Sequence, residues 1–248
     1  MDSPFYGPRL KMKQSGRHLE CLRKVLADYA ARVRFGFQKS ELPESNLTEW
    51  TLVFSEPPPD DVAPLVGDSI HNLRSALDLM ICEVARLRDQ GTDHLAFPFS
   101  KDEQQLDKQI RERDIARLGS DIVELVKAEK PYPEGNRALS GLHVLDIMDK
   151  HQMIIPAYEA APFGNIRMGS LSIFPGGVMH MMPGGSITLA RGNTLSFKQQ
   201  GEVTAIFPNI SPFPRAPVIE VLNGLTGTVA GVIDRFEAHL REGTWPSA

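Results

Sequence analysis

The apolar residues of this chain recur every three or four positions over several long stretches, a spacing that places them on one face of an α-helix. One such pattern begins after SEPPPDD, where three prolines stop the preceding element and an aspartate can open the next helix. The predicted helices cover residues 12–39, 60–89, 102–129, 138–151 and 216–241. A predominantly helical body is therefore expected.

A second pattern, in which apolar and polar residues alternate, predicts strands in two parts of the chain. Trp50, Leu52 and Phe54 alternate with polar or smaller residues in a short strand near residues 49–54. Between residues 169 and 208, five short alternating runs are separated by Pro-Gly-Gly, Pro-Gly-Gly, Arg-Gly-Asn and Gln-Gly turns. Turns at this spacing favour an antiparallel meander.

Together these elements predict an α+β fold, with a helical bundle followed by an antiparallel β-meander and a C-terminal helix. Residues 1–160 are expected to form the helical body and to include the short strand. Residues 161–248 are expected to form the meander and the last helix, which packs back on the body. The two parts are either separate domains or one single domain.

Two of the predicted helices carry a stripe of polar residues beside their apolar face. An α-helix turns by about 100° per residue, so positions three and seven residues apart lie close to one line. The stripes consist of His71, Arg74 and Asp78 in the second predicted helix, and of His143, Asp146 and Lys150 in the fourth. Buried charges are costly unless they are paired, so the two stripes are expected to face each other as a polar seam.

The charges of the two stripes are complementary whichever way the helices run. Arg74 can meet Asp146 in both directions, and a guanidinium and a carboxylate can form two parallel hydrogen bonds. Asp78 then meets Lys150 if the helices are parallel, or His143 if they are antiparallel. The sequence therefore predicts an Arg74–Asp146 ion pair at the centre of the seam.

Three roles of the polar seam stay open at the level of the sequence. The seam can be a structural network that fixes the register of two helices. It can be the catalytic site of a nucleic-acid-directed phosphodiesterase, in which His71 or His143 transfers protons while Arg74 or Lys150 stabilises an anion. It can also bind a divalent metal, because imidazole and carboxylate ligands suit zinc, iron or manganese. The ligands of such a metal are predicted to be His71, Asp78, His143 and Asp146.

No other cofactor is expected. The chain contains no P-loop, no Rossmann fingerprint and no GxSxG nucleophile elbow. Its Pro-Gly-Gly units follow the pattern of turns and lack the strand–helix context of a phosphate-binding loop.

The charge of the chain is unevenly distributed. The formal net charge is −4, which argues against a protein that coats nucleic acid. Residues 1–39 nevertheless carry nine Lys or Arg and only three Asp or Glu. A basic amphipathic helix can bind phosphates or an acidic partner, so RNA or another phosphate-containing ligand is compatible with the sequence. A homodimer is compatible with it as well.

The two cysteines and the absence of long apolar segments bear on the compartment. Cys21 and Cys82 are too few for a disulfide framework, and both are expected to be buried free thiols. No stretch approaches the 18 apolar residues of a membrane span, and the N-terminus does not resemble a secretory signal. A cytoplasmic protein without membrane contact is therefore expected.

The motifs GDSIHNLRSALD, FPFS and LHVLDIMDKHQMIIP resemble a widespread family of uncharacterised bacterial proteins. Its members share GDxxHNLRSALDH, a short FP motif and LHxLxxxDKHR, followed by a strand-rich region. The resemblance covers most of the chain, and the two long motifs are specific. It implies a site at the polar seam and brings no established activity.

The chain is also similar, more weakly, to HEPN-type helical domains. Several of these are metal-independent ribonucleases that use an Arg-x4–6-His pair on one helix. Arg74 matches the arginine of that pair, whereas Leu79 stands where the bacterial family usually has a histidine. If HEPN chemistry operates here, His71 or His143 takes the place of that imidazole. Otherwise the chain is not such a nuclease.

Overall fold

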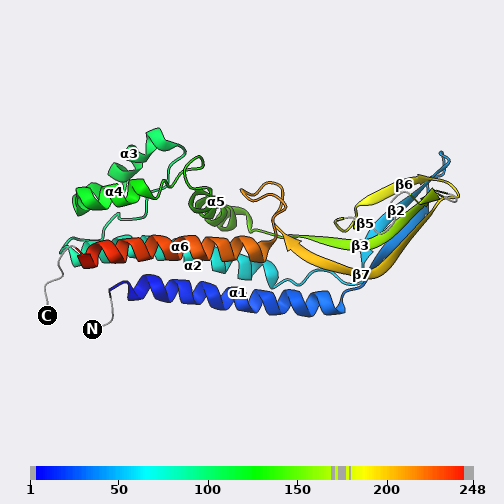
Figure 1. Ribbon diagram of the computed structural model, residues 1–248, viewed down its shortest axis with the longest axis horizontal. Coiled ribbons are helices and arrows are strands. Elements are labelled where there is room, and N and C mark those ends of the chain that lie inside the picture. The colour runs from blue at the N-terminus through cyan, green and yellow to red at the C-terminus, as the bar shows by residue number, and fades with distance from the viewer. Residues whose placement is uncertain (1–3, 169–170, 173–176, 179, 243–248) are drawn as a thin grey trace.

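The computed structural model describes residues 4–168, 171–172, 177–178 and 180–242. Figure 1 shows an elongated molecule in which a helical body occupies one end and a β-arm, formed by the strands, extends from the other. The predicted α+β class is confirmed, with helices first, antiparallel strands in the middle and a closing helix. The first helix begins at Tyr6, six positions before its predicted start.

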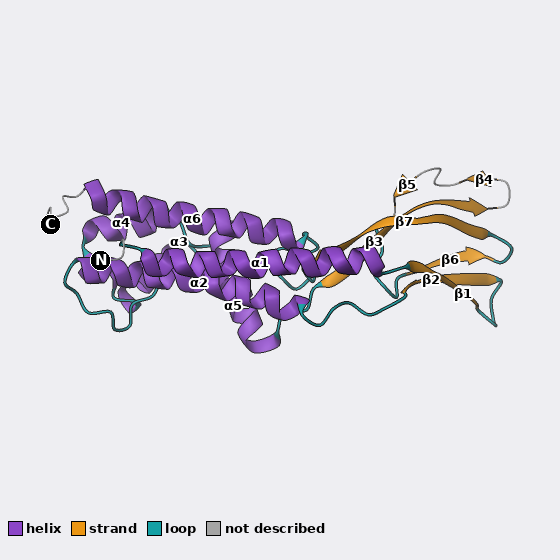
Figure 2. Cartoon of the chain, turned by 90° about the horizontal axis from the view of Figure 1, so that it is seen from below, coloured by secondary structure: helices purple, strands orange, loops and turns teal. Residues whose placement is uncertain are grey.

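Four helices build the centre of the body. They are α1 (Tyr6–Arg32), α2 (Val62–Leu87), α5 (Arg137–Gln152) and α6 (Val218–Glu242). Figures 1 and 2 show α2 and α6 side by side, with α1 on one side of them and α5 on the other. The apolar faces that the sequence predicts meet in this arrangement, and Ile70, Leu77 and Val229 are completely buried. Burial of such side chains contributes about 1.5–3 kcal/mol each, which holds the layers together.

The charged segment 102–129 does not form one helix. It contains α3 (Glu103–Glu112), a short 3-10 helix (Ile115–Leu118) and α4 (Ser120–Ala128). The breaks fall at Asp114 and Gly119, whose φ angles of 57° and 112° are incompatible with a continuous right-handed helix. The helical propensity was visible in the sequence, but these two backbone conformations were not.

The first helix ends earlier than predicted. It stops at Arg32, and residues 35–41 form strand β1 (Phe35–Glu41) rather than the last turns of a helix that runs to residue 39. Strand β1 pairs antiparallel with β2 (Leu47–Phe54), which confirms the strand near residues 49–54. Phe35 lies opposite Phe54 and belongs with Leu52 to the small core of the β-arm, and burial in this core outweighs the helical pattern of the basic segment.

The remaining strands are antiparallel, but neighbours in the sheets are not always neighbours in the chain. They are β3 (Ala157–Met168), β4 (Leu171–Ser172), β5 (Gly177–Val178), β6 (Ser186–Ala190) and β7 (Thr194–Ile206). Strand β7 returns along β3, whereas β6 joins the sheet of β1 and β2. The strand order therefore departs from that of a simple meander.

These pairings connect the two parts predicted from the sequence, residues 1–160 and residues 161–248. Residue 160 lies inside β3, and β2 from the first part pairs with β6 from the second. Helix α6, from the second part, contributes Leu222 and Phe236 to the same hydrophobic core as α1 and α2. The two predicted parts of the chain are thus joined by paired strands in the β-arm and by a shared core in the body.

Two smaller observations concern the cysteines and membranes. Cys82 is half-buried, but Cys21 is exposed, so the expectation that Cys21 is buried is wrong. It follows directly after the exposed Glu20, outside the row of buried residues that contains Leu19 and Leu22.

None of the described helices has an apolar segment long enough to cross a bilayer.

Two glycines in helices are predicted to respond in opposite ways to alanine. At Gly67 a Cβ would overlap the carboxylate of Asp149, which also accepts a hydrogen bond from the backbone of Ile154. We therefore expect Gly67→Ala to lower the free energy of unfolding by about 1 kcal/mol or more. Gly227 has open space around its Cβ position, so Gly227→Ala should raise it by about 0.5–1 kcal/mol. Urea unfolding measures both, and stabilisation by Gly67→Ala would contradict the close packing of α2 on α5.

Candidate active site

Helices α2 and α5 run antiparallel and bring the two polar stripes together. Asp149 of α5 lies against Gly67, and Asp146, one turn earlier in α5, lies against His71, one turn later in α2. The stripes therefore face each other as predicted, in the antiparallel arrangement. Gly67 matters here because its missing side chain leaves room for the Asp149 carboxylate.

The outer half of the seam consists of His71, Asp146 and Lys150, and Asp146 is the buried residue between the other two. Its side chain is 5% exposed, and its Oδ1 lies 3.1 Å from His71 Nδ1 while its Oδ2 accepts a hydrogen bond of 2.5 Å from Lys150 Nζ. The side chains of His71 and Lys150 are 51% and 52% exposed. A buried carboxylate thus holds one imidazole and one ammonium group at the surface.

The hydrogen bond to Asp146 also fixes the chemical form of His71. An ionised carboxylate only accepts hydrogen bonds, so Nδ1 of His71 carries a proton. In the neutral ring Nε2 is then an acceptor that points away from Asp146. The hydroxyl of Ser75 lies 3.4 Å from this Nε2. Ser75 does not belong to the predicted stripes, although it follows His71 by four residues, the spacing that places two side chains on one helix face.

The predicted Arg74–Asp146 pair is not formed among the described contacts. Arg74 forms an ion pair with Asp78, four residues along α2, although its Nη1 lacks hydrogen-bond geometry there. Its Nη2 donates to the carbonyl of Phe97 at 3.4 Å. Asp78 Oδ1 in turn accepts a hydrogen bond of 2.9 Å from the backbone nitrogen of Phe97. The pair fails because the antiparallel register sets His71 opposite Asp146, and Asp78 is within reach of Arg74 on its own helix.

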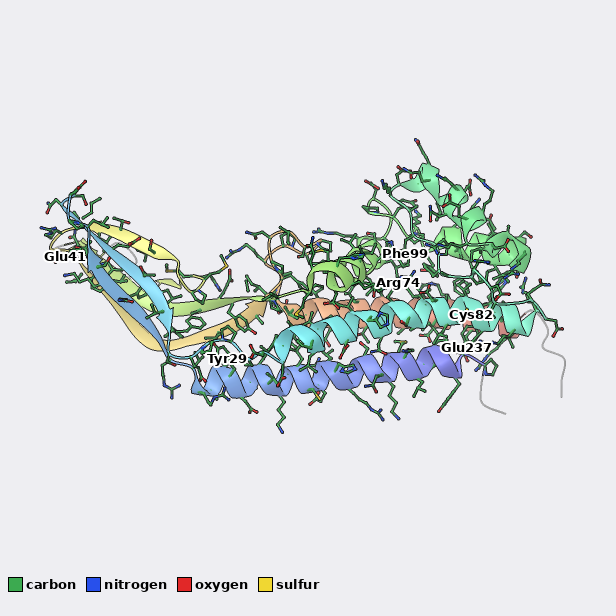
Figure 3. All side chains as sticks on the ribbon, turned by 180° about the vertical axis from the view of Figure 1, so that it is seen from behind. Tyr29, Glu41, Arg74, Cys82, Phe99 and Glu237 are labelled. Atoms are coloured by element: carbon green, nitrogen blue, oxygen red, sulfur yellow. The ribbon has the colours of Figure 1, made fainter. Side chains whose placement is uncertain are left out.

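The inner half of the seam consists of Arg74, Asp78 and His143, and the ring of Phe99 packs over it. Figure 3 shows Arg74 on α2 beside Phe99, and the guanidinium carbon lies 4.6 Å from the centre of that ring. The imidazole of His143 stacks on Phe99 as well, with ring centres 4.5 Å apart and planes within 6°. Both Phe97 and Phe99 are buried. The FPFS loop therefore packs as core over Arg74 and His143.

His143 is held in its neutral form. Burial, together with the positive charge of Arg74, lowers the pKa of His143 to about 4. Its Nδ1 is buried and has no hydrogen-bond partner among the described atoms. A neutral imidazole that is stacked under a loop is poorly placed to exchange protons with a substrate.

The residues predicted as metal ligands are divided between the two halves. Asp146 binds His71 and Lys150, whereas Asp78 binds Arg74 and the backbone of Phe97. Within the part of the chain that the structure describes, no three His, Cys, Asp or Glu side chains are grouped so that they could hold a metal ion. A divalent metal at the seam stays a prediction.

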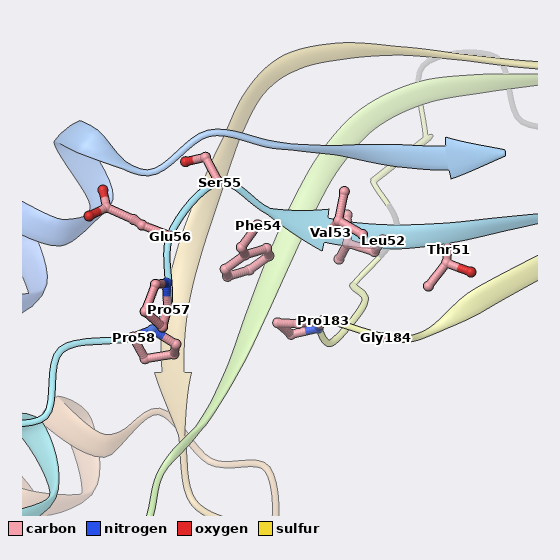
Figure 4. Close-up of a pocket in the computed structure, with 10 residues that line it drawn as sticks. All are labelled: Thr51, Leu52, Val53, Phe54, Ser55, Glu56, Pro57, Pro58, Pro183 and Gly184. Atoms are coloured by element: carbon pink, nitrogen blue, oxygen red, sulfur yellow. The ribbon is translucent and has the colours of Figure 1, made fainter.

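The β-arm contains a separate hollow. Figure 4 shows it between the end of β2 and the Pro183–Gly184 turn, and its volume is about 400 Å³. Its lining includes Phe54, Pro57 and Pro58. Two of the polar groups beside it form hydrogen bonds elsewhere, because Ser55 Oγ accepts from the backbone of Arg34 and the carbonyl of Glu56 accepts from the Tyr29 hydroxyl. The hollow is apolar and offers no chemistry comparable with that of the seam.

A comparison of the chain with protein-family models, with curated proteins and with solved structures found no match. What the polar seam can do must therefore be inferred from its own geometry.

Proposed function

We propose that the protein hydrolyses phosphodiester bonds without a metal, and that His71 transfers the proton. The proposed substrate is nucleic acid, with RNA as the preferred kind. The observation that carries this proposal is the buried Asp146 carboxylate, which holds His71 and Lys150 with half of each side chain exposed. Histidine is the most common general acid or base in enzymes, and a carboxylate at Nδ1 orients it and stabilises its cation.

The roles within the seam divide according to exposure. His71 accepts the proton of the attacking hydroxyl or water through Nε2, and Asp146 positions it. Lys150 supplies a positive charge for the anionic phosphate at the surface. The inner residues Arg74 and His143 act as scaffold, since one is paired with Asp78 and the other lies under the FPFS loop.

Helix α1 adds basic charge beside this face of α2. Asp68, three residues before His71, lies 4.0 Å from His18 of α1, so α1 borders the face on which His71 lies. The outer side of α1 exposes Lys13, Arg17 and Lys24, for which the described residues offer no acidic partner. These three residues lie on the side of α1 opposite its buried residues Ser15, Leu19 and Leu22, so they support the long-range attraction of a polyanion to this part of the molecule.

The test measures the rates at which wild type and variants cleave a short single-stranded RNA and bis(p-nitrophenyl) phosphate, with a chelator present. We expect His71→Ala to lower the rate by at least about 100-fold, because the proton acceptor is lost. Asp146→Asn should lower it by at least about tenfold, because an amide nitrogen facing Nδ1 favours the wrong tautomer. The control is His151→Ala, which removes an exposed histidine from α5, the helix that carries Asp146, and should leave the rate unchanged.

Three outcomes would contradict the proposal. Equal rates for wild type and His71→Ala would remove His71 from the chemistry. Activity that appears only after Zn²⁺ or Mn²⁺ is added would favour the metal-dependent alternative. A folded wild type without turnover on either substrate would favour a binding module in which the seam is structural, as its inner half already is.

A further inference from the structure

We infer that Ser75 is the nucleophile of this site, and that phosphodiester cleavage proceeds through a covalent phosphoserine intermediate. The inference rests on the proposed function and adds the attacking group to it. Ser75, His71 and Asp146 then form a relay from the surface to the buried carboxylate, with 3.4 Å between Ser75 Oγ and His71 Nε2 and 3.1 Å between His71 Nδ1 and Asp146 Oδ1.

The direction of the hydrogen bonds agrees with this role. The ionised Asp146 carboxylate cannot donate, so His71 donates from Nδ1, and in its neutral form keeps a free electron pair on Nε2. The Ser75 hydroxyl is therefore the donor in its contact with Nε2. This is the arrangement in which an imidazole withdraws the proton of an attacking hydroxyl.

The orientation of the Ser75 side chain differs from the common orientation of a hydroxyl inside a helix. A serine or threonine inside a helix commonly donates to a backbone carbonyl three or four residues earlier. Thr226 donates to Leu222, Thr228 to Gly224 and Ser140 to Arg137 in this way. The Ser75 hydroxyl instead contacts the imidazole of His71, which is half exposed.

The reaction balances with these groups and water. Ser75 Oγ forms a bond to phosphorus while its proton moves to His71 Nε2, and the bond from phosphorus to the leaving oxygen breaks. The imidazolium returns that proton to the leaving alkoxide. A water molecule then attacks the phosphoserine and gives a proton to His71, which passes it to Ser75 Oγ as the serine leaves. No metal, oxidant or further co-reactant is consumed.

The test uses a fluorophosphonate, which phosphonylates activated serines irreversibly. Full-length protein is treated at neutral pH, and the adduct is located by peptide mass spectrometry. We expect one adduct per chain, on Ser75, with labelling at least about tenfold slower in His71→Ala and in Asp146→Asn. Ser75→Ala should lose the adduct, and its fold should persist because alanine is the best helix former. Ser140→Ala, whose hydroxyl donates to a backbone carbonyl, should be labelled like wild type.

The same variants separate this inference from the proposed function. If Ser75→Ala keeps full turnover of bis(p-nitrophenyl) phosphate while His71→Ala loses it, the nucleophile is wrong and the proton-transfer role stands. Labelling elsewhere, or none in an active protein, also overturns the assignment of Ser75. If Ser75 is labelled but no phosphodiester is cleaved, the nucleophile stands and the proposed substrate class fails.

Discussion

Asp78→Ala is expected to lower the free energy of unfolding by about 3 kcal/mol or more. Asp78 is the ion-pair partner of Arg74, whose side chain is only 10% exposed, and it accepts the hydrogen bond from the backbone of Phe97. The substitution leaves a buried guanidinium without its counter-charge and a backbone N–H without its acceptor. Chemical denaturation at neutral pH gives the value directly.

Three further variants sharpen this prediction. Asp78→Asn keeps an acceptor for Phe97 and should cost less than Asp78→Ala. Arg74→Ala should also cost less, because the Asp78 side chain it leaves behind is 35% exposed and can be hydrated. Asp68→Ala, on the same helix but 63% exposed, is the control and should change stability by less than about 0.5 kcal/mol. If Asp78→Ala behaved like Asp68→Ala, the Arg74–Asp78 pair would not anchor the FPFS loop.

The second large effect is a loss of stability in acid that originates at His143. The pKa of His143 is lowered to about 4 in the folded chain, from an ordinary value of 6.5. As the pH falls below 6.5, the unfolded chain binds a proton at this histidine while the folded chain does not. Unfolding is therefore favoured increasingly down to about pH 4, by at most about 3 kcal/mol.

The contribution of His143 is isolated by comparing variants. His143→Phe keeps a ring to stack on Phe99 and removes the titrating group, so it should lose less stability than wild type between pH 7 and pH 4.5. The carboxylates act alike in both proteins, and their contribution cancels in the difference. His151→Gln, which removes an exposed histidine of the same helix, should retain the wild-type pH dependence. An equal pH dependence in His143→Phe would show that this imidazole is protonated in the folded state.

The polar seam shows what residue spacing can predict and what it cannot. Spacing alone identifies the two stripes, because residues three, four and seven apart must share a helix face whatever the rest of the chain does. It does not fix the partners, because a shift of one helical turn exchanges them. In the structure Asp146 meets His71 instead of Arg74, and Arg74 meets Asp78. The division of the seam into an exposed half and a half closed by Phe99 follows from a loop whose position the stripes do not encode.

Segment boundaries show the same limit. The basic segment up to residue 39 has the periodicity of a helix, yet Phe35–Glu41 is a strand, because Phe35 is buried opposite Phe54 in the small core of the β-arm. Asp114 and Gly119 interrupt the segment 102–129 through backbone conformations with positive φ that the charged pattern does not reveal.

The sequence by itself determines the α+β class, the identity of the long helices and the residues of the polar seam, since each depends on local periodicity. Only the tertiary structure decides that Asp146 lies against His71 and not against Arg74, and that His71 and Lys150 are half exposed while Arg74 and His143 lie against Phe99. These features depend on the register of α5 against α2 and on the FPFS loop, which bring together residues up to 75 positions apart in the chain. Contacts over such separations are set by the packing of whole elements, which local spacing does not specify.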